Sequence, residues 1–241
     1  MENLLMSASE FQQITSQILF EDNHLIILNK KASQIVQGDK TGDTPLCDLV
    51  KAYLKKKYGK PGDVFLGIPH RLDRPVSGVV VFTKTSKALS RVNKMIHDRE
   101  FYKTYWAISK NRPPKEEDTL IHYLRKNEKL NKSFAFEKPE KDTLKAELSY
   151  RYLSSSDKYN LIEVELHTGR HHQIRVQLAE IGCIIKGDLK YGAERSNPDG
   201  SISLHARKLK FKHPVKDDLL EITAPVPKDD LWLFFEKENQ S

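Results

Sequence analysis

The sequence predicts an α+β fold built on a curved, largely antiparallel mixed β-sheet that is flanked by helices. Residues 144–152 and 162–166 alternate apolar and polar side chains on either side of a polar turn, as the strands of an antiparallel hairpin do. Stretches with helical spacing lie among the strands without the regular alternation of a doubly wound sheet. The chain also contains neither a Walker A loop nor a dinucleotide fingerprint.

The composition is that of a globular protein with an excess of basic residues. The 241 residues, 38% hydrophobic and 30% charged, suffice for one large domain or two small ones. A run of about 18 apolar residues, as a membrane span requires, is absent. The net charge of +7 favours a polyanionic partner. Residues 1–6 lack the basic region of a signal peptide, and Cys47 and Cys183 lack metal or redox spacing, so we expect reduced thiols in a cytoplasmic protein.

The first half of the chain alternates short apolar blocks with helical stretches. Residues 1–17 are polar and weakly patterned, which indicates a loose end or a short helix. Residues 25–28 and 79–82 are continuous apolar blocks, typical of buried strands. A helix is expected from Thr44-Pro45 to the lysines at 55–57, and Thr85 or Ser86 caps a second one.

The second half is richer in strands. The lysine-rich segment 125–143 predicts a hairpin or a mobile insert, and both an RNA contact and a solubilising loop are open for it. A helix with Ile174, Leu178 and Ile181 on its buried face ends at Gly182. Further strands are expected at 101–108, 183–186, 204–211 and 219–223, and a last helix from Asp229 or Asp230.

The strongest chemical signal lies in the stretch His70-Arg71-Leu72-Asp73-Arg74-Pro75-Val76-Ser77-Gly78. Asp73 stands between two guanidinium side chains on a turn closed by Pro75 and Gly78. Two positive charges favour an ionised carboxylate, which suits a nucleophile or a charge stabiliser better than a general acid. A structural Arg–Asp pair that ties the turn to the next strand explains the same residues, so chemistry alone leaves both interpretations open.

This stretch, followed by an apolar strand and Thr83-Lys84-Thr85, resembles the signature of the RluA-type RNA pseudouridine synthases. Four further blocks resemble that family, and they occur in the family's order over most of residues 18–225: the opening block 18–30, the tyrosine block Lys103-Thr104-Tyr105-Trp106-Ala107, the arginine block 161–192 with His171-His172-Gln173-Ile174-Arg175, and the block 204–214. One such motif is a weak signal, but five in order are a strong one.

The resemblance implies that two halves of the sheet flank a central cleft with Asp73 at its base. The reaction would be the isomerisation of uridine to pseudouridine in structured RNA, on a nucleotide flipped out of its stack. Asp73 would be the essential carboxylate, Tyr105 would stack on the base and Arg175 would hold Asp73. Without the resemblance, Tyr105 is a core aromatic of a strand and Arg175 a surface arginine. The reaction needs no cofactor.

Other basic side chains are candidates for holding the RNA. We expect Arg71, Arg74 and His70 to bind the substrate, and Arg170 to lie at a helix N-terminus suited to a phosphate. Histidines 167, 171 and 172 do not have the His-Glu-x-x-His spacing of a zinc protease, so we expect no metal site. The sequence departs from the family pattern at Lys31, Val76 and Gln177, where proline, threonine and histidine are common.

These observations predict an N-terminal extension, residues 1–17, and a catalytic domain, residues 18–241. The partner would be a stem-loop of ribosomal or transfer RNA, and the protein a monomer. Two other classes remain to be distinguished. An RNA-binding module that has lost activity would bind RNA without forming product, and a metal-dependent or two-carboxylate hydrolase would need a second acid near Asp73.

Overall fold

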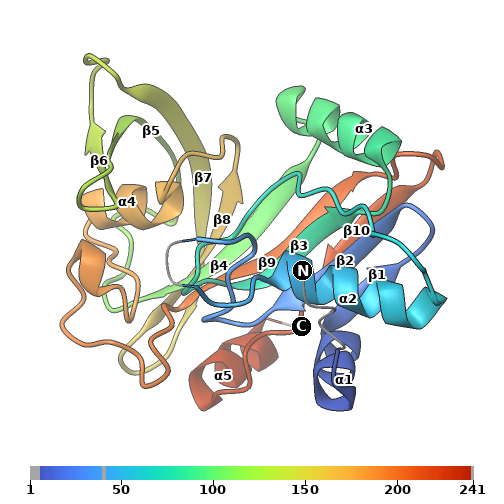
Figure 1. Cartoon of the computed structure of the whole chain (residues 1–241). Coiled ribbons are helices and arrows are strands. Elements are labelled where there is room, and N and C mark those ends of the chain that lie inside the picture. Colours follow the sequence, from blue (N-terminus) through green and yellow to red (C-terminus); the bar gives the residue numbers. More distant parts are fainter. Residues whose placement is uncertain (1–5, 40–41, 240–241) are drawn as a thin grey trace. The chain divides into compact units, whose positions relative to one another are not determined.

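The computed structural model describes residues 6–39 and 42–239, and the chain divides into two compact units. The first unit is Met1–Phe101 with Leu209–Ala224, and the second is Tyr102–Lys208 with Pro225–Ser241. Strands of a large, mostly antiparallel sheet with helices packed on them make up both units (Figure 1). The predicted α+β class is therefore confirmed.

The first unit is built around two buried strands. Its elements are α1 (Ala8–Gln17), β1 (Ile18–Glu21), β2 (Leu25–Lys30), α2 (Leu46–Tyr58), β3 (Ser77–Thr83), α3 (Ser86–His97), the end of β9 (Leu204–Lys212) and β10 (Leu219–Thr223). β2 pairs antiparallel with β1 and with β3, and β10 pairs with β9. Every residue of β3 is buried, as are all of β2 except Asn29. Because side chains alternate between the faces of a strand, both faces are covered, which explains the continuous apolar blocks in the sequence.

Helices α3 and α1 of this unit each begin with a side-chain cap. The Thr85 side chain accepts a hydrogen bond from the Ala88 N–H at 3.2 Å, which starts α3 as predicted. At α1, Ser7 and Glu10 form a reciprocal capping box, so the expected short helix is present within 1–17. Residues 1–5 of that expected segment lie outside the described residues.

The second unit is a five-stranded antiparallel arrangement in the order β4-β8-β7-β5-β6, with the start of β9 beside β4. Its elements are β4 (Tyr102–Ser109), β5 (Glu117–Asn127), β6 (Lys132–Phe136), β7 (Leu144–Ser155), β8 (Asn160–Leu166), α4 (Gln173–Glu180), the short 3₁₀-helix η1 (Leu189–Tyr191) and α5 (Asp230–Glu238). The hairpin predicted from alternation is β7–β8, and the lysine-rich segment forms part of the hairpin β5–β6. α4 packs on β5 and β6, and α5 packs on β7 (Figure 1).

The strand predicted at 183–186 is wrong. Only Ile185 pairs there, in an isolated bridge with Ser109. Gly182 and Gly187 bracket the segment with positive φ angles of 78° and 87°, which a continuing strand cannot contain. Cys183 and Ile185 are buried and Ile184 is half-buried, in a turn-rich connection to η1.

Both cysteines are buried free thiols, as expected, and burial raises the pKa of each to about 11. Among the described residues, no helix is both long and apolar enough to cross a bilayer.

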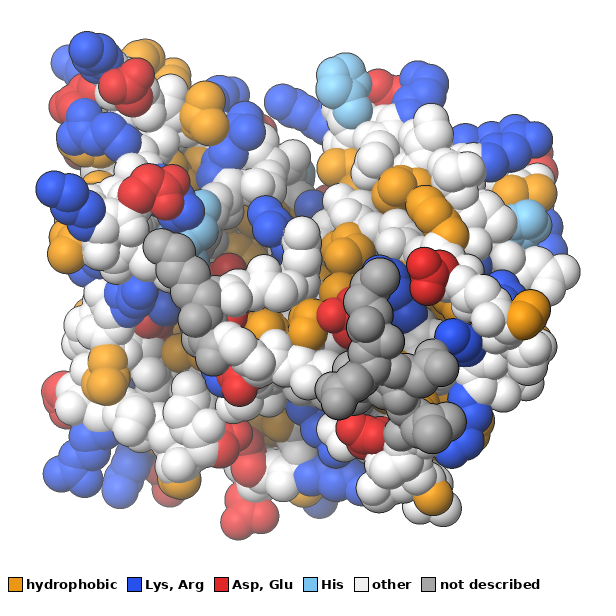
Figure 2. Space-filling view, viewed as in Figure 1, with side chains coloured by type: hydrophobic (Ala, Val, Ile, Leu, Met, Phe, Trp, Pro, Cys, Tyr) orange, Lys and Arg blue, Asp and Glu red, His pale blue; other side chains and the backbone are white. Residues whose placement is uncertain are grey.

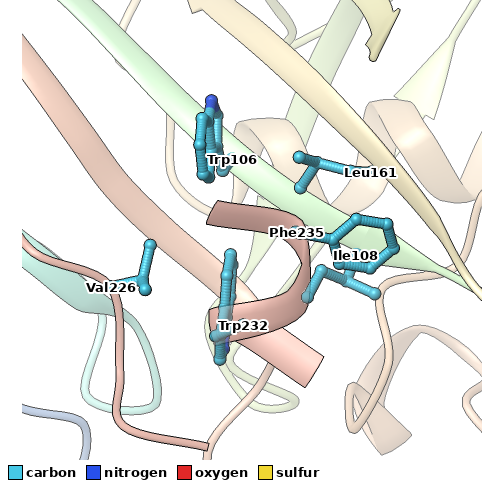
Figure 3. Packing of buried hydrophobic residues seen from close by; sticks show 6 residues of the cluster. All are labelled: Trp106, Ile108, Leu161, Val226, Trp232 and Phe235. Carbon is cyan, nitrogen blue, oxygen red and sulfur yellow. The ribbon is translucent and has the colours of Figure 1, made fainter. Parts of the chain in front are cut away.

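A hydrophobic cluster lies between α5 and one face of β4 and β8. Trp106, Ile108 and Leu161 from the strands pack against Val226, Trp232 and Phe235 from the C-terminal segment (Figure 3). Phe235 has no exposed surface, whereas its neighbour Phe234 is 41% exposed.

This difference gives a stability test. Phe235→Ala should lower the free energy of unfolding by about 3–5 kcal/mol, because it leaves a cavity in the core. Phe234→Ala, the same change one residue earlier, should cost less than about 1 kcal/mol. Urea denaturation followed by tryptophan fluorescence measures both, and equal losses would contradict the assigned core.

Candidate active site

Asp73 lies in a tight turn that leads into β3. The Val76 N–H donates to the Asp73 carbonyl at 3.1 Å, which closes the turn predicted from Pro75 and Gly78. Gly78 has a φ of 116° and lies opposite Lys30 in the β2–β3 pairing. The turn is therefore fixed to the most buried strands of the first unit.

Lys30 holds the backbone of this turn through hydrogen bonds, a role that the sequence did not reveal. Its side chain has no exposed surface, and its ammonium donates to the carbonyls of Val76 at 2.7 Å, Lys31 at 3.0 Å and Arg74 at 3.2 Å. Burial lowers the pKa of Lys30 to about 7, although the nearby Asp73 carboxylate acts to raise it. Lys30 thus interacts electrostatically with Asp73 when its amine is protonated.

The two arginines beside Asp73 in sequence are exposed and contact other residues. Arg74 forms an ion pair with Asp43, and an Arg71 N–H donates to the Gln37 side chain at 3.5 Å. Both guanidiniums therefore remain accessible to a polyanion. The expectation that they flank Asp73 followed from sequence adjacency alone.

His70 is fixed by the strand that follows the turn. Its Nε2 accepts a hydrogen bond from the Val81 N–H at 3.0 Å, and its ring lies 5.5 Å from that of Phe101. An accepting Nε2 requires its proton on Nδ1 in the neutral ring. His70 is therefore positioned by β3 before any substrate arrives.

Tyr105 lies in the middle of β4, opposite Val164 of β8, and is 7% exposed. Lys103 lies two residues earlier and so shares its face of the strand. Burial lowers the pKa of Lys103. A Cβ at Gly169 would lie 3.6 Å from the Lys103 ammonium, so this lysine reaches the loop that precedes α4.

Arg175 is a buried residue of α4, which contradicts its interpretation as a surface arginine. It is 5% exposed, and each residue from Gln173 to Leu178 is buried. Its guanidinium makes a two-pronged pair with Asp188: Nε–Oδ2 is 2.7 Å and Nη2–Oδ1 is 2.8 Å. Asp188, which the sequence did not single out, is 1% exposed. Such a fork fixes the orientation of a guanidinium as well as its charge.

Arg170 precedes α4 and is exposed. Its Nε donates to the Lys145 carbonyl at 3.0 Å, and its backbone N–H donates to the Gln173 side chain at 3.0 Å. The backbone N–H of Arg170 is therefore already bonded to the Gln173 side chain. A phosphate contact would have to come from the guanidinium.

The three histidines of this region contact hydroxyl groups. His167 Nε2 lies 2.8 Å from Ser149 Oγ, His171 Nδ1 lies 2.9 Å from Ser133 Oγ, and His172 Nδ1 lies 3.0 Å from the Tyr191 hydroxyl. Within residues 6–39 and 42–239, no group of three or more His, Cys, Asp or Glu side chains could hold a metal ion.

Comparisons with known proteins decide the family. The sequence model of the family described as RNA pseudouridylate synthase matches residues 24–180, which is more than half of the chain. The chain belongs to the RNA pseudouridylate synthase family. It is an enzyme that isomerises uridine to pseudouridine in RNA.

Two relatives illustrate the family's range. The synthase is 30% identical over 259 residues to the ribosomal large subunit pseudouridine synthase D of Xylella fastidiosa, which covers 94% of this chain and 74% of the relative. It is 32% identical over 235 residues to the tRNA pseudouridine synthase C of Vibrio cholerae, which covers 90% of this chain and 92% of the relative.

The fold agrees with a solved structure of similar size. The structure of human RNA pseudouridylate synthase domain containing 4 matches with a TM-score of 0.77 at 23% identity, covering 95% of this chain and 94% of the other. At that identity the likeness bears on the fold.

The buried lysine gives a test with a defined pH dependence. The pKa of Lys30 is about 7 in the folded chain against an ordinary value of 10.5, so between these values the unfolded chain binds a proton that the folded chain does not. The stability of the wild-type protein relative to Lys30→Met should therefore rise with pH in this window, by up to about 1.4 kcal/mol per pH unit. Urea denaturation at pH 7, 8 and 9 measures it.

Lys31→Met is the matched control, because Lys31 is exposed. Its effect on the free energy of unfolding should be small and should not change over the same pH range. A wild-type minus Lys30→Met difference that is equal at pH 7 and pH 9 would contradict the lowered pKa.

Proposed function

We propose that this synthase modifies specific uridines in ribosomal or transfer RNA, with Asp73 as its catalytic carboxylate. The observation that carries the proposal is the Asp73 turn, whose backbone is held by a fully buried lysine and two buried strands. The substrate class rests on the names of relatives, which include a ribosomal and a transfer RNA enzyme.

The chemistry explains why a fixed carboxylate is needed. The bond between the sugar C1′ and uracil N1 breaks, the base turns, and C5 joins C1′ while the C5 proton is lost and N1 is protonated. The target base is stacked in an RNA stem-loop, so the nucleotide must swing out before its sugar can be reached. Asp73 acts on that sugar, either by attacking it or by removing a proton from it.

Tyr105 and Arg175 act with Asp73 in this proposal. The phenol ring of Tyr105 stacks on the uracil, and its hydroxyl can bond or relay a proton. Arg175 holds the Asp73 carboxylate in one orientation and keeps it charged, which a planar guanidinium does better than a lysine. The burial of Tyr105 and Arg175 supports roles that need fixed side chains.

Four further side chains bind the RNA in the same proposal. Arg71 and Arg74 fill the space left by the displaced base or grip phosphates, and Arg170 contacts the backbone of the RNA. Their exposure and charge support this. His70, held in place by the Val81 N–H of β3, contacts the substrate beside the turn.

The remaining properties follow from this role. We assign residues 18–241 to a single catalytic domain with residues 1–17 as an extension, acting as a monomer in the cytoplasm. Two buried free thiols support a reducing compartment. Sedimentation of the purified protein tests the monomer, and a dimer at micromolar concentration would contradict it.

The decisive variant is Asp73→Asn, which keeps the shape of the side chain and removes its charge. It should reduce pseudouridine formation by at least about 10⁴-fold, as loss of a catalytic group does, while RNA affinity stays within about threefold of wild type. Release of tritium from C5-labelled uridine in RNA measures turnover, and filter binding measures affinity.

Asp63→Asn is the control for this change, because Asp63 is an exposed aspartate of the same unit. It should leave both measurements unchanged. Normal turnover by Asp73→Asn would remove Asp73 from the site. RNA binding without turnover by the wild-type protein would instead favour the inactive binding module, and hydrolysis of the RNA that a chelator abolishes would favour the hydrolase.

Mapping pseudouridines across cellular RNA identifies the target. Cells that lack this protein should lose modification at one or a few uridines of ribosomal or transfer RNA. The wild-type gene should restore those sites and the Asp73→Asn gene should not. An unchanged map would contradict the proposed substrate class.

A further inference from the structure

The Arg175–Asp188 pair is part of a larger buried arrangement in the second unit. Both side chains are nearly inaccessible, with 5% and 1% exposure, and Asp188 occupies the Nε edge of the guanidinium with both of its oxygens. A buried carboxylate is costly unless a charge and hydrogen bonds meet it, so the two residues fix each other. Asp188 follows Gly187, whose φ of 87° turns the chain towards η1.

Tyr191, at the end of η1, completes the arrangement. The Arg175 guanidinium lies over its ring, with 5.2 Å between the guanidinium carbon and the ring centroid. The ring also packs in a buried cluster with Leu124, Ala146 and Val176, which come from β5, β7 and α4. The flat face of the guanidinium therefore rests on a ring that three other elements hold in place.

The Tyr191 hydroxyl is tied to two other segments. It accepts a hydrogen bond from the Ser133 N–H at 2.9 Å, lies 3.2 Å from the Ser133 carbonyl and lies 3.0 Å from His172 Nδ1. Ser133 belongs to β6 of the lysine-rich hairpin, and Lys132 of the same strand lies 4.9 Å from the centroid of the Tyr191 ring. Figure 2 shows basic side chains with acidic ones among them over this end of the unit.

His172 stays neutral beside this pair. Burial lowers its pKa to about 2, and the Arg175 charge acts in the same direction. A neutral imidazole does not compete with Arg175 for the Asp188 carboxylate. Its positive φ of 54° is unusual for a residue other than glycine, which places the ring at the start of α4 at a conformational cost.

We propose that Asp188 and Tyr191 are positioning residues that set the orientation of Arg175 for the isomerisation. This inference rests on the proposed function, because it assumes that Arg175 acts on the catalytic carboxylate. Asp188 binds the Nε edge of the guanidinium and Tyr191 packs against its plane. Together they leave a single orientation for the Nη1 end. Tyr191 further links that orientation to the hairpin β5–β6.

The test compares Asp188→Asn with the wild type in single-turnover and steady-state assays. The amide keeps the shape but loses the charge, so Arg175 should lose its fixed orientation. The expected result is a fall in kcat of at least about 30-fold with KM for RNA within about threefold, the effect of misplacing a group by about 1 Å. Tyr191→Phe removes only the hydroxyl and should lower kcat by about 3- to 10-fold.

Glu236→Gln is the matched control, because Glu236 is the partner of Arg207 in another largely buried ion pair of the same unit, at 2.9 Å. It should leave kcat within about twofold of wild type, whatever its effect on thermal stability. If Asp188→Asn and Glu236→Gln lose the same small amount of activity per folded molecule, the positioning role is overturned.

A double-mutant cycle separates positioning from general stabilisation. A residue that acts through Arg175 should lose its effect in an Arg175→Lys background, so Asp188→Asn should add less than about twofold there. Fully additive effects would overturn the inference. A wild-type protein that forms no pseudouridine would overturn the proposed function, whereas an active wild type with a normal Asp188→Asn variant overturns only this inference.

Discussion

Two buried basic side chains hold the segments around the proposed site of this synthase, because a polar group removed from water must be met by oxygen atoms of the protein. Lys30 meets three carbonyls at and beside the Asp73 turn, and Arg175 meets both oxygens of Asp188. Lys30 thereby holds backbone 44 and 46 residues away, and Arg175 holds the side chain of Asp188. The loop before β3 and the connection after α4 have little regular structure of their own, and these contacts supply the order that hydrogen-bonded strands supply elsewhere.

Most of the fold could be predicted because its signals are local. The alternation in β7 and β8, the continuous apolar blocks of β2 and β3 and the capping residue Thr85 each determine structure within about ten residues. β5 was not predicted as a long strand because its exposed residues outnumber its buried ones. The segment 183–186 was wrongly predicted as a strand because three of its four residues are apolar, but Gly182 and Gly187 in the left-handed region turn the chain on either side of it.

The residues of the proposed site also differ in whether their role follows from local sequence or from distant contacts. Asp73, Tyr105 and Arg175 could be proposed as catalytic because the sequence contains the blocks of the family in the family's order, and the burial of Tyr105 and Arg175 is consistent with the fixed positions that the proposal requires. Lys30 and Asp188 could not, because their meaning lies in partners that only the folded chain brings close: Lys30 contacts carbonyls 44 and 46 residues away. Arg175 stood one position from the apolar stripe of its helix, where pattern alone assigns it to the surface. The ion pair with Asp188 allows the charged Arg175 side chain to be buried, which the helix pattern alone did not indicate.

An isomerisation places a particular demand on these groups. Uridine and pseudouridine contain the same atoms, so no group is supplied or carried away, and each side chain must end the reaction in the state in which it began. An aspartate that remained protonated or attached to sugar would block the next cycle. In the proposed mechanism the protein therefore gains more from holding one carboxylate and one guanidinium in place than from adding further acids and bases. The Arg175 guanidinium is suited to that demand because its charge is independent of pH near neutrality. Its orientation is set by two buried residues of another segment, Asp188 and Tyr191.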